Sequence, residues 1–335
     1  MGACLPVGRV FCYNNAMKKS AGFFLVFLVG FLMGWAVFFI TSDNNDQNIS
    51  EIREGGYIYI NPLLDCDQSD AINEKNLRSF KKKVENLVNQ QLEDELINHI
   101  SVYYRDLNNG PWFGINEENN YAPQSLLKLP IMIAYLKLSQ TNPELLDKTI
   151  VYDQFLYQAK DNSAEVDYYQ ADQSYQVNQL IERMIIYSDN TAFNILVKNI
   201  NQQDIQKVHQ DLGLAYPTTE TPDDFISVKS YASLFRVLYN SSYLNREKSE
   251  LALDILSRSE YDRGITAGLP TDMVVANKFG IREENEEIKQ LHDCGIVYSA
   301  NNPYMICLMS RGNFITKLED SIKEISKLIY QEVVK

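Results

Sequence analysis

The distribution of strand-like and helical patterns constrains the fold more than any other feature of this sequence. Residues 100–104 and 112–115 alternate as strands do, and residues 273–278, 294–298 and 304–309 repeat that pattern near the other end. The long segment between these two groups has helical periodicity. A single sheet can collect strands from both chain ends when a helical domain is inserted between them. The sequence therefore predicts an α+β fold: an antiparallel sheet flanked by helices, formed from both chain ends, plus an all-helical domain.

Helices are predicted where apolar residues recur every three to four positions. These segments are residues 74–96, 126–138, 177–187, 191–200, 247–257 and 315–334. A further helix start is predicted at Thr221 and Pro222. A threonine N-cap, a proline in the first turn and the acids Asp223 and Asp224 all favour a helix there.

Residues 20–42 carry no charge, and most of this segment is apolar. A helix of that length spans about 34 Å, which is enough to cross a bilayer. Only basic charges precede the segment, and Asp43 and Asp46 follow it, so the positive-inside rule places the remainder outside the cytoplasm. A cleaved signal peptide is the alternative. Its apolar core would be shorter, and no small-x-small cleavage site is evident, so a retained anchor is favoured.

The chain is accordingly expected to be a single-pass protein of the cell membrane, with its folded domain extracytoplasmic and the lipid bilayer as a partner. Residues 57–60 are expected to form an edge strand or an extended arm. The predicted parts are a cytoplasmic tail at 1–20, a transmembrane anchor at 21–42, a linker and N-terminal arm at 43–73, and a folded domain at 74–335 with a helical subdomain at about 125–258.

Charge and cysteine content exclude several classes of function. The net charge of −13 argues against nucleic acid as a partner. The sequence has no glycine loop that would cradle a phosphate and no cysteine at metal-ligand spacing, so no cofactor or metal is expected. Cys66, Cys294 and Cys307 follow the anchor, an odd number that leaves no complete disulfide framework. A hairpin loop of five residues centred on Asn301 would point Cys294 and Cys307 to opposite faces, so both are interpreted as small core residues.

Three short motifs carry the chemistry that this sequence offers. Ser125 and Lys128 lie at the start of an apolar segment, and residues three apart on a helix share a face, so the amine lies beside the hydroxyl. A serine becomes a nucleophile when a neighbouring base takes its proton, and a partly desolvated lysine can be that base. The other two motifs are Ser188-Asp189-Asn190 and Lys278-Phe279-Gly280.

Each motif alone is weak. Ser79 and Lys82 repeat the first spacing in a charged helix, and Ser42-Asp43-Asn44 repeats the second at the membrane edge, so both copies are interpreted as chance. Simpler roles also exist, since serine is a common N-cap and Ser-Asp-Asn favours turns. Asp189 is interpreted as structural, bonded to the turn backbone. The order and flanks of the three motifs favour the chemical interpretation.

With these motifs, and with segments such as Tyr103-Tyr104-Arg105-Asp106-Leu107 and His292-Asp293-Cys294-Gly295, the chain resembles the penicillin-recognising serine acyl-hydrolases and, among them, the class A β-lactamases. The resemblance runs from about residue 75 to the C-terminus. It implies a β-lactamase/transpeptidase-like fold, with a sheet packed by helices and joined to a helical domain. The site is then expected in the cleft between them.

The resemblance implies a role for each motif residue. Ser125 would attack a carbonyl and become acylated, and Lys128 would accept its proton directly or through water. Ser188 would pass a proton to the leaving nitrogen, held between Lys128 and Lys278. Asn190 would donate to the amide side chain of the substrate. Lys278 would add positive charge opposite a substrate carboxylate.

The same resemblance implies an oxyanion hole formed by two backbone N–H groups. The backbone N–H groups of Ser125 and Ile281 would form it, with Gly280 as a further substrate-binding residue, and such a hole is worth several kcal/mol. One departure lies in this strand. Phe279 stands where the family carries Ser or Thr, so a hydroxyl that would bind the substrate carboxylate is lost and a bulky ring is expected near the cleft.

A second departure concerns the glutamate that deacylates the enzyme in this family. It lies on a loop between the Ser-Asp-Asn motif and the Thr-Pro helix start, but Asn190 and Thr221 are only 31 positions apart here. Because residues 191–214 read as helix, the stretch 215–220 is too short for that loop. Glu220 is the nearest acid and a candidate base for water, although a place beside the next helix N-terminus is favoured.

Three functions remain open. The leading one is a membrane-anchored serine acyl-hydrolase that hydrolyses β-lactams, or is acylated by them at Ser125, with slow deacylation. A D-alanyl peptidase or transpeptidase acting on cell-wall peptides is the second. The third is a non-catalytic binding or sensing module on the same fold. A small-molecule β-lactam or a cell-wall peptide is thus the expected substrate.

Overall fold

The computed structural model describes residues 49–53, 55–68, 74–93, 97–108, 110–157, 168–283, 288–300 and 302–335. The chain forms two compact units, residues 1–47 and 48–335, and every described residue belongs to the second. The predicted cytoplasmic tail and transmembrane anchor therefore lie outside the described residues. Across the described ranges, no helix combines the length and the apolar character needed to span a bilayer.

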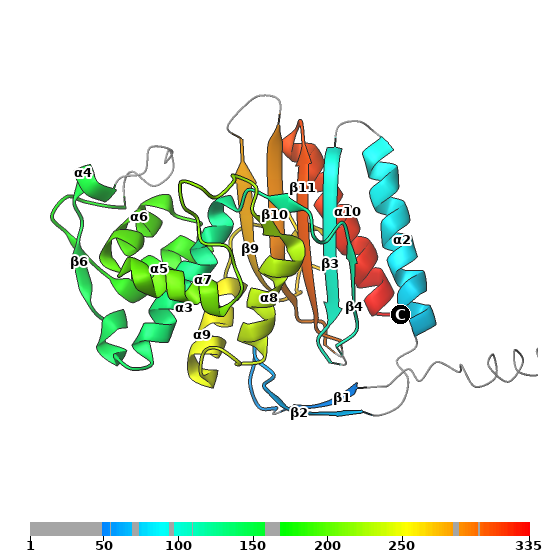
Figure 1. The fold of residues 1–335 in the computed structure, drawn as a ribbon, viewed down its shortest axis with the longest axis horizontal. Helices are drawn as coiled ribbons and strands as arrows, with labels where there is room; N and C mark the ends of the chain where they lie inside the picture. Colours follow the sequence, from blue (N-terminus) through cyan, green and yellow to red (C-terminus); the bar gives the residue numbers. More distant parts are fainter. Residues whose placement is uncertain are drawn as a thin grey trace, which may run out of the picture. The chain divides into compact units, whose positions relative to one another are not determined.

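A five-stranded antiparallel sheet collects strands from both ends of the second unit (Figure 1). The first strand of this sheet in chain order pairs directly with its last strand. This pairing is what a helical insertion between two groups of strands requires, and the predicted α+β fold is confirmed. In spatial order the strands are β4 (Trp112–Ile115), β3 (Ile97–Asp106), β11 (Tyr304–Gly312), β10 (Lys289–Val297) and β9 (Val275–Arg282).

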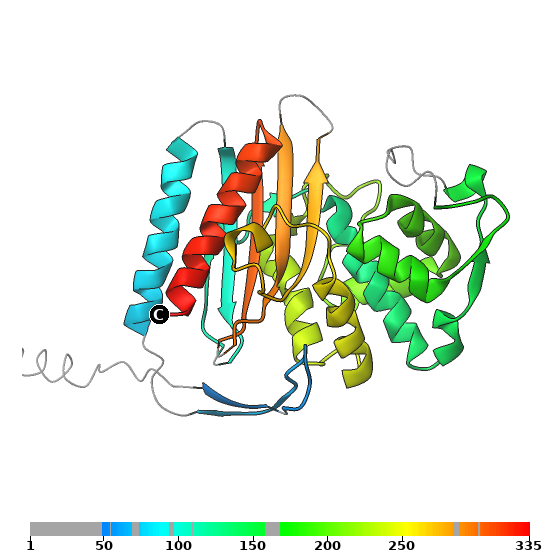
Figure 2. The same cartoon turned by 180° about the vertical axis from the view of Figure 1, so that it is seen from behind.

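Helices cover both faces of this sheet. Figure 2 shows α2 (Glu74–Glu93) and α10 (Ile315–Val333) side by side on one face, where Leu308 of β11 joins their apolar core. The other face packs against α8 (Val228–Tyr239), and Met305 of β11 belongs to that second core. Because both faces are covered, β11 is apolar along nearly its whole length instead of alternating.

The inserted region is helical, as the sequence predicts. Two short pairs of strands close it: β5 (Asn120–Tyr121) with β8 (Ile226–Ser227), and β6 (Thr149–Val151) with β7 (Ser174–Gln176). Its helical elements are η1 (Gln124–Leu127), α3 (Lys128–Ser139), η2 (Pro143–Leu146), α4 (Gln154–Tyr157), α5 (Val177–Ile186), α6 (Asn190–Asn199), α7 (Gln202–Asp211), α8, α9 (Arg246–Ser257) and η3 (Thr266–Gly268).

The predicted helix start at Thr221 and Pro222 is wrong. The chain stays irregular there and enters β8, and α8 begins only at Val228. Ser227 caps that helix, because its side chain accepts from the N–H of Ser230 while the Ser230 side chain accepts from the N–H of Ser227. Pairing of β8 with β5 holds residues 226 and 227 in a strand, and this tertiary contact overrides the local helix signal.

The interpretation of Cys294 and Cys307 as separate core residues is also wrong. The two residues are directly opposite each other in the β10–β11 register and form a disulfide. The hairpin closes with Val297 opposite Tyr304, so its loop spans residues 298–303. That loop is one residue longer than expected, and the extra residue places both cysteines on the same face of the sheet.

Residues 57–60 form no strand but an irregular segment that is hydrogen-bonded to α9. The carboxylate of Glu250 in α9 accepts from the N–H groups of Ile58, Tyr59 and Ile60, at 2.8, 3.1 and 2.9 Å. The Tyr298 hydroxyl at the end of β10 donates to the Tyr59 carbonyl. This segment connects β1 (Ile49–Arg53) to its antiparallel partner β2 (Leu63–Gln68). One carboxylate thus ties the start of the described chain to the helical region.

The close approach of β9 and β10 gives a test of the sheet packing. A Cβ at Gly295 would lie 2.5 Å from the carbonyl oxygen of Ala276 and 2.7 Å from the Asn277 Cβ. We therefore expect Gly295→Ala to lower the free energy of unfolding by about 1–3 kcal/mol, the usual cost of overpacking. Chemical denaturation would measure it. Gly55→Ala is the matched control, since nothing lies within 4 Å of its Cβ, and equal stability of both variants would contradict this packing.

Candidate active site

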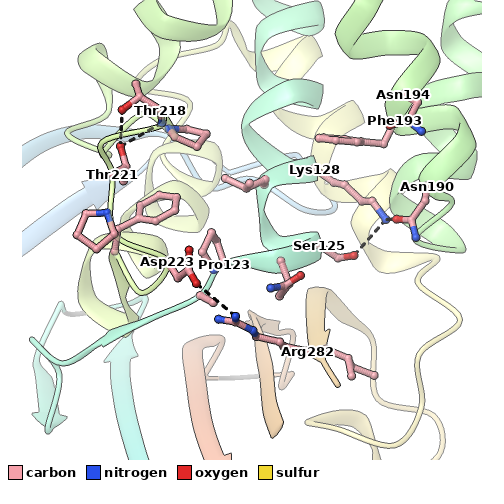
Figure 3. A pocket seen from close by; sticks show the side chains of 17 residues that line it. Pro123, Ser125, Lys128, Asn190, Phe193, Asn194, Thr218, Thr221, Asp223 and Arg282 are labelled. Atoms are coloured by element: carbon pink, nitrogen blue, oxygen red, sulfur yellow. Dashed lines mark hydrogen bonds and ion pairs between the residues drawn. The ribbon is translucent and has the colours of Figure 1, made fainter. Parts of the chain in front are cut away.

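Ser125 lies in a cavity of about 720 Å³ between the edge strand β9 and the helical region (Figure 3). Ile281 and Arg282 of β9 form one wall, and α6 with residues 217–225 forms much of the rest. The cavity therefore lies where the sheet meets the inserted helices, which is the place predicted from the sequence.

The nucleophile candidate occupies a single turn of 3₁₀ helix and not the α-helix expected for it. Ser125 is in η1, and α3 begins at Lys128. Gln124, the preceding residue, has a φ of 47°, a conformation that non-glycine residues adopt only when their surroundings enforce it. The predicted spacing survives this difference, because the Lys128 Nζ lies 3.1 Å from the Ser125 Oγ.

Lys128 is the centre of a polar network although its side chain is almost fully buried. Besides Ser125, its Nζ contacts the Ser188 Oγ at 3.1 Å and the Asn190 Oδ1 at 2.6 Å, and it donates to the Ser188 carbonyl oxygen. These groups come from η1, from α3, from the α5–α6 connection that carries Ser188, and from the first residue of α6. One amine therefore holds together two of the three sequence motifs.

Lys278 joins the third motif to the same network. Its side chain is 0% exposed, and its Nζ lies 2.9 Å from the Ser188 Oγ. Burial and the positive charge of Lys128 hold the pKa of Lys278 well below its usual value, and the carboxylate of Asp293 opposes this shift. The Ser188 hydroxyl is thus flanked by two lysine amines in a water-poor environment.

This arrangement provides a path for a proton. With Lys128 neutral, its amine is placed to take the proton of Ser125 as the oxygen attacks an electrophilic carbon. The Ser188 hydroxyl lies between Lys128 and Lys278, so it can accept a proton from one amine while it gives its own to a leaving group. The network can therefore support acyl transfer to Ser125.

Comparison with known proteins identifies the family of this chain. Residues 79–333 match the family model described as the β-lactamase enzyme family. The chain belongs to the β-lactamase enzyme family. It is therefore a serine hydrolase by family, and the predicted resemblance is confirmed.

Solved structures share the fold at low sequence identity. PBP-A is 20% identical with a TM-score of 0.65, and the match covers 76% of this chain and 96% of PBP-A. A class A β-lactamase from Bacteroides cellulosilyticus is 18% identical with a TM-score of 0.68, covering 76% and 98%. One from Mycobacterium abscessus is 20% identical with a TM-score of 0.65, covering 74% and 98%. The β-lactamase/transpeptidase-like fold is thereby confirmed.

Asp189 holds the Ser188 turn of this β-lactamase-family protein in place. Its buried carboxylate accepts from the Tyr169 hydroxyl at 2.7 Å, from the Arg183 Nε at 2.9 Å and from the Ala192 N–H at 2.9 Å. The last contact caps α6. Ser188 itself has a φ of 57°, and these fixed neighbours enforce that conformation.

Side chains of strand β10 position the turn that carries Ser125. The Gln290 Oε1 accepts from the N–H of Ala122 at 3.1 Å, and the His292 Nε2 lies 3.0 Å from the Ala122 carbonyl oxygen. From the helical side, the Tyr231 hydroxyl donates to the carbonyl of Leu126 at 3.0 Å. The turn that carries Ser125 is thus fixed on both sides of the nucleophile.

Asp293, next to His292, links three segments beneath Lys278. Its carboxylate accepts from the Asn277 side chain and from the Ile265 N–H, both at 2.8 Å. Burial raises the pKa of Asp293 to about 6, although these hydrogen bonds act in the opposite direction. A Cβ at Gly264 would lie 2.2 Å from this carboxylate, so only glycine fits there.

Sequence reasoning missed these positioning residues for identifiable reasons. The segment around His292 and Asp293 was part of the family resemblance, but spacing alone gives no role to a residue on a buried strand. Tyr231 reads as an ordinary apolar position of an amphipathic helix. Cys294, which is bonded to Cys307, lies opposite Lys278 in the β9–β10 register, and no sequence pattern indicates that pairing.

Phe279 does not line the cavity. Its ring stacks on Tyr261, with centroids 4.1 Å apart and planes 15° apart, and the Lys278 Nζ lies 4.2 Å from the ring centroid. The aromatic ring therefore takes the place of a hydroxyl near Lys278 and packs sideways instead of filling the cleft.

Glu220 is exposed and is absent from the described lining of the cavity, and it does not lie at a helix N-terminus because α8 begins at Val228. Among the described lining residues, Asp223 supplies the one carboxylate, and its Oδ2 lies 3.4 Å from the Arg282 Nη2. Residues 217–225 form this wall of the cavity, and the carboxylate that they contribute is Asp223 and not Glu220.

The ion pair at Asp189 predicts a stability effect. Asp189→Asn should lower the free energy of unfolding by about 3 kcal/mol, because it leaves Arg183 without its buried carboxylate partner. Tyr169→Phe is the milder control: it removes two hydrogen bonds of the hydroxyl, one to Asp189 and one from the Arg183 Nε, keeps the ion pair, and should cost about 1–2 kcal/mol. Urea denaturation of both variants measures the difference. An asparagine variant as stable as the phenylalanine variant would refute the central place of this carboxylate.

His292 predicts a pH dependence of stability. Burial lowers the pKa of His292 to about 4, so the unfolded chain binds a proton between pH 6.5 and 4 and the folded chain does not. Stability should therefore fall as the pH drops through this window, by roughly 3 kcal/mol in total. His292→Gln should lose this part of the pH dependence.

Asp293 has the opposite sign, because its raised pKa favours the folded state as the pH falls from about 6 to 4. It is common to both proteins, so the difference in unfolding free energy between wild type and His292→Gln isolates the histidine. Denaturation series at pH 7, 5 and 4 would show it. A constant difference across the three pH values would contradict the buried, neutral state of His292.

Proposed function

We propose that this protein is a membrane-anchored, extracytoplasmic serine acyl-hydrolase that β-lactams acylate at Ser125, and that it releases the acyl group slowly. One observation carries the proposal: the Lys128 Nζ lies 3.1 Å from both the Ser125 Oγ and the Ser188 Oγ, while Lys278 approaches Ser188 from the other side. Nucleophile, base and proton relay are therefore in contact without any rearrangement.

Acylation follows from these contacts. The Ser125 oxygen attacks the lactam carbonyl, and Lys128 takes the hydroxyl proton. The oxyanion is held by the backbone N–H groups of Ser125 and Ile281. The C–N bond of the ring then breaks, and the nitrogen receives a proton through Ser188. Asn190, at the rim of the same network, binds the amide of the acyl side chain.

Deacylation needs a second base, and the cavity offers a poor one. A water molecule that attacks the ester must lose a proton as it does so. Asp223, the carboxylate among the described lining residues, pairs with Arg282, and Glu220 faces solvent. The acyl-enzyme is therefore expected to outlive the acylation step.

A D-alanyl peptidase or transpeptidase acting on cell-wall peptides is the second candidate. The same acylation chemistry serves a peptide whose terminal residue leaves, and a long-lived acyl-enzyme suits transfer to an amine. A variant of PBP-A has been solved as an acyl-enzyme complex with penicillin G, so this fold can hold an acyl-enzyme. A non-catalytic module would retain the fold without any adduct.

The extracytoplasmic location has support from the described chain. Disulfides persist mainly in oxidising compartments, and Cys294 and Cys307 form one in the middle of the sheet. Together with the uncharged segment at residues 20–42, this favours export with a retained anchor at 21–42. A mature protein whose N-terminus begins after residue 40 would show instead that the segment is cleaved.

Intact-mass spectrometry tests the acylation. Incubation with benzylpenicillin should add one molecule of the antibiotic per protein, because ring opening loses no atoms. Ser125→Ala should abolish this adduct. Ser79→Ala is the matched control: Ser79 has the same spacing to Lys82 but lies exposed on α2, and its variant should be acylated normally. An adduct that persists in Ser125→Ala would refute the assignment of the nucleophile.

A further inference from the structure

We propose that Arg282 and Asp223 form an anion-recognition site at the rim of the cavity, which selects acyl donors that carry a carboxylate on their acyl side. This inference rests on the proposed acylation of Ser125 and names the substrate class that the same cleft prefers.

Two opposite charges meet across the cavity that holds the nucleophile. Arg282 is the last residue of β9, and Asp223 belongs to the irregular segment that precedes β8. The Arg282 Nη2 and the Asp223 Oδ2 are 3.4 Å apart, and both side chains line the same cavity as Ser125 (Figure 3). A carboxylate of the protein thus already lies against this guanidinium.

The two partners differ in how firmly the protein holds them. The side chain of Arg282 is 21% exposed, whereas that of Asp223 is 82% exposed. Their contact is long at 3.4 Å and its carboxylate partner is exposed to water, so this ion pair is weak. A guanidinium can bind a carboxylate through two parallel hydrogen bonds, which are stronger. A ligand carboxylate can therefore replace Asp223 at little cost, and Asp223 in turn repels or attracts a ligand according to its charge.

The position along β9 identifies which part of the substrate reaches this site. The N–H of Ile281 is the proposed donor to the reacting carbonyl, and Arg282 is the next residue on the strand. An acyl group that is bound to Ser125 and extends between Asn190 and β9 therefore passes the guanidinium of Arg282. At the other end of the motif, Phe279 offers a ring stacked on Tyr261 and no hydroxyl. Of the two cations of this strand, Arg282 is the one that lines the cavity where the acyl side chain passes.

Three penicillins provide a matched series of probes. Benzylpenicillin, carbenicillin and ampicillin differ at one carbon of the acyl side chain, which carries hydrogen, a carboxylate or an amine. The measured quantity is the second-order rate constant of acylation, expressed as a ratio to that of benzylpenicillin. Arg282→Gln should lower the carbenicillin ratio about tenfold, the loss expected for one charge-assisted contact. Asp223→Asn should raise the carbenicillin ratio and lower the ampicillin ratio.

A carbenicillin ratio that falls in Arg282→Gln and rises in Asp223→Asn is the result that recognition of the carboxylate predicts. Arg258→Gln is the control, because Arg258 pairs with Glu182 and Asp254 away from the cavity and should leave the ratios unchanged. If Arg282→Gln and Asp223→Asn shift the carbenicillin ratio in the same direction, or if neither shifts it, the recognition site is refuted.

Equilibrium binding to Ser125→Ala separates recognition from chemistry. Calorimetric titration of this variant should show that carbenicillin binds more tightly than benzylpenicillin, and that adding Arg282→Gln removes the difference. If this preference is present while the wild type forms no adduct with any of the three penicillins, the proposed function fails and the anion site stands. If the preference is absent, the anion site is refuted whether or not Ser125 is acylated.

Discussion

The contact of two buried lysine amines with one serine hydroxyl is the interaction on which the rest of this site depends. Lys128 and Lys278 approach the Ser188 Oγ at 3.1 and 2.9 Å, and both are almost fully removed from solvent. Burying two ammonium groups together is strongly unfavourable, and the pKa of Lys278 is held below its usual value by burial and by the positive charge of Lys128. Nucleophilic attack needs a neutral amine beside Ser125, so a proton of Lys128 has to move. The Ser188 hydroxyl connects Lys128 to the amine of Lys278 and offers a path for that proton.

Burial of the two lysines is unfavourable, and the packing of the sheet against the inserted helices offsets its cost. Lys278 comes from the edge strand of the sheet, and Lys128 and Ser188 come from the inserted helices, so the site exists only when both parts are packed. Fixed hydrogen bonds reinforce this junction from each side, through Asp189 in the helical region and Asp293 in the sheet. Non-glycine residues with positive φ occur immediately before the nucleophile and at Ser188 itself, where strain is held by these neighbours.

Much of the fold and the centre of the site could be predicted from the sequence. Strand alternation at both chain ends and helical periodicity between them fix the architecture, and the spacing of Ser125 and Lys128 predicts their contact. The errors arose where a long-range contact outweighs a local signal. Thr221 begins a good local helix signal, but pairing of β8 with β5 holds residues 226 and 227 in a strand and no helix forms before Val228. The disulfide between Cys294 and Cys307 forms because the hairpin loop is one residue longer than expected, and the periodicity of the strands does not determine the length of that loop.

The contribution of Arg282 illustrates the same limit at the cavity wall. It follows the Lys278-Phe279-Gly280 motif by two positions, whereas its partner Asp223 lies far away in the chain, in a segment whose sequence predicts a helix start. The pairing becomes visible only in the folded protein, because it depends on the irregular course of residues 217–225.

The central claim is that this network acylates Ser125 readily and frees it slowly. Rapid mixing with a chromogenic cephalosporin tests it most directly, because the chromophore reports opening of the lactam ring. The account predicts a burst of about one equivalent of opened ring per protein, followed by a much slower steady phase. Linear, rapid turnover without a burst would contradict it, since deacylation would then be at least as fast as acylation.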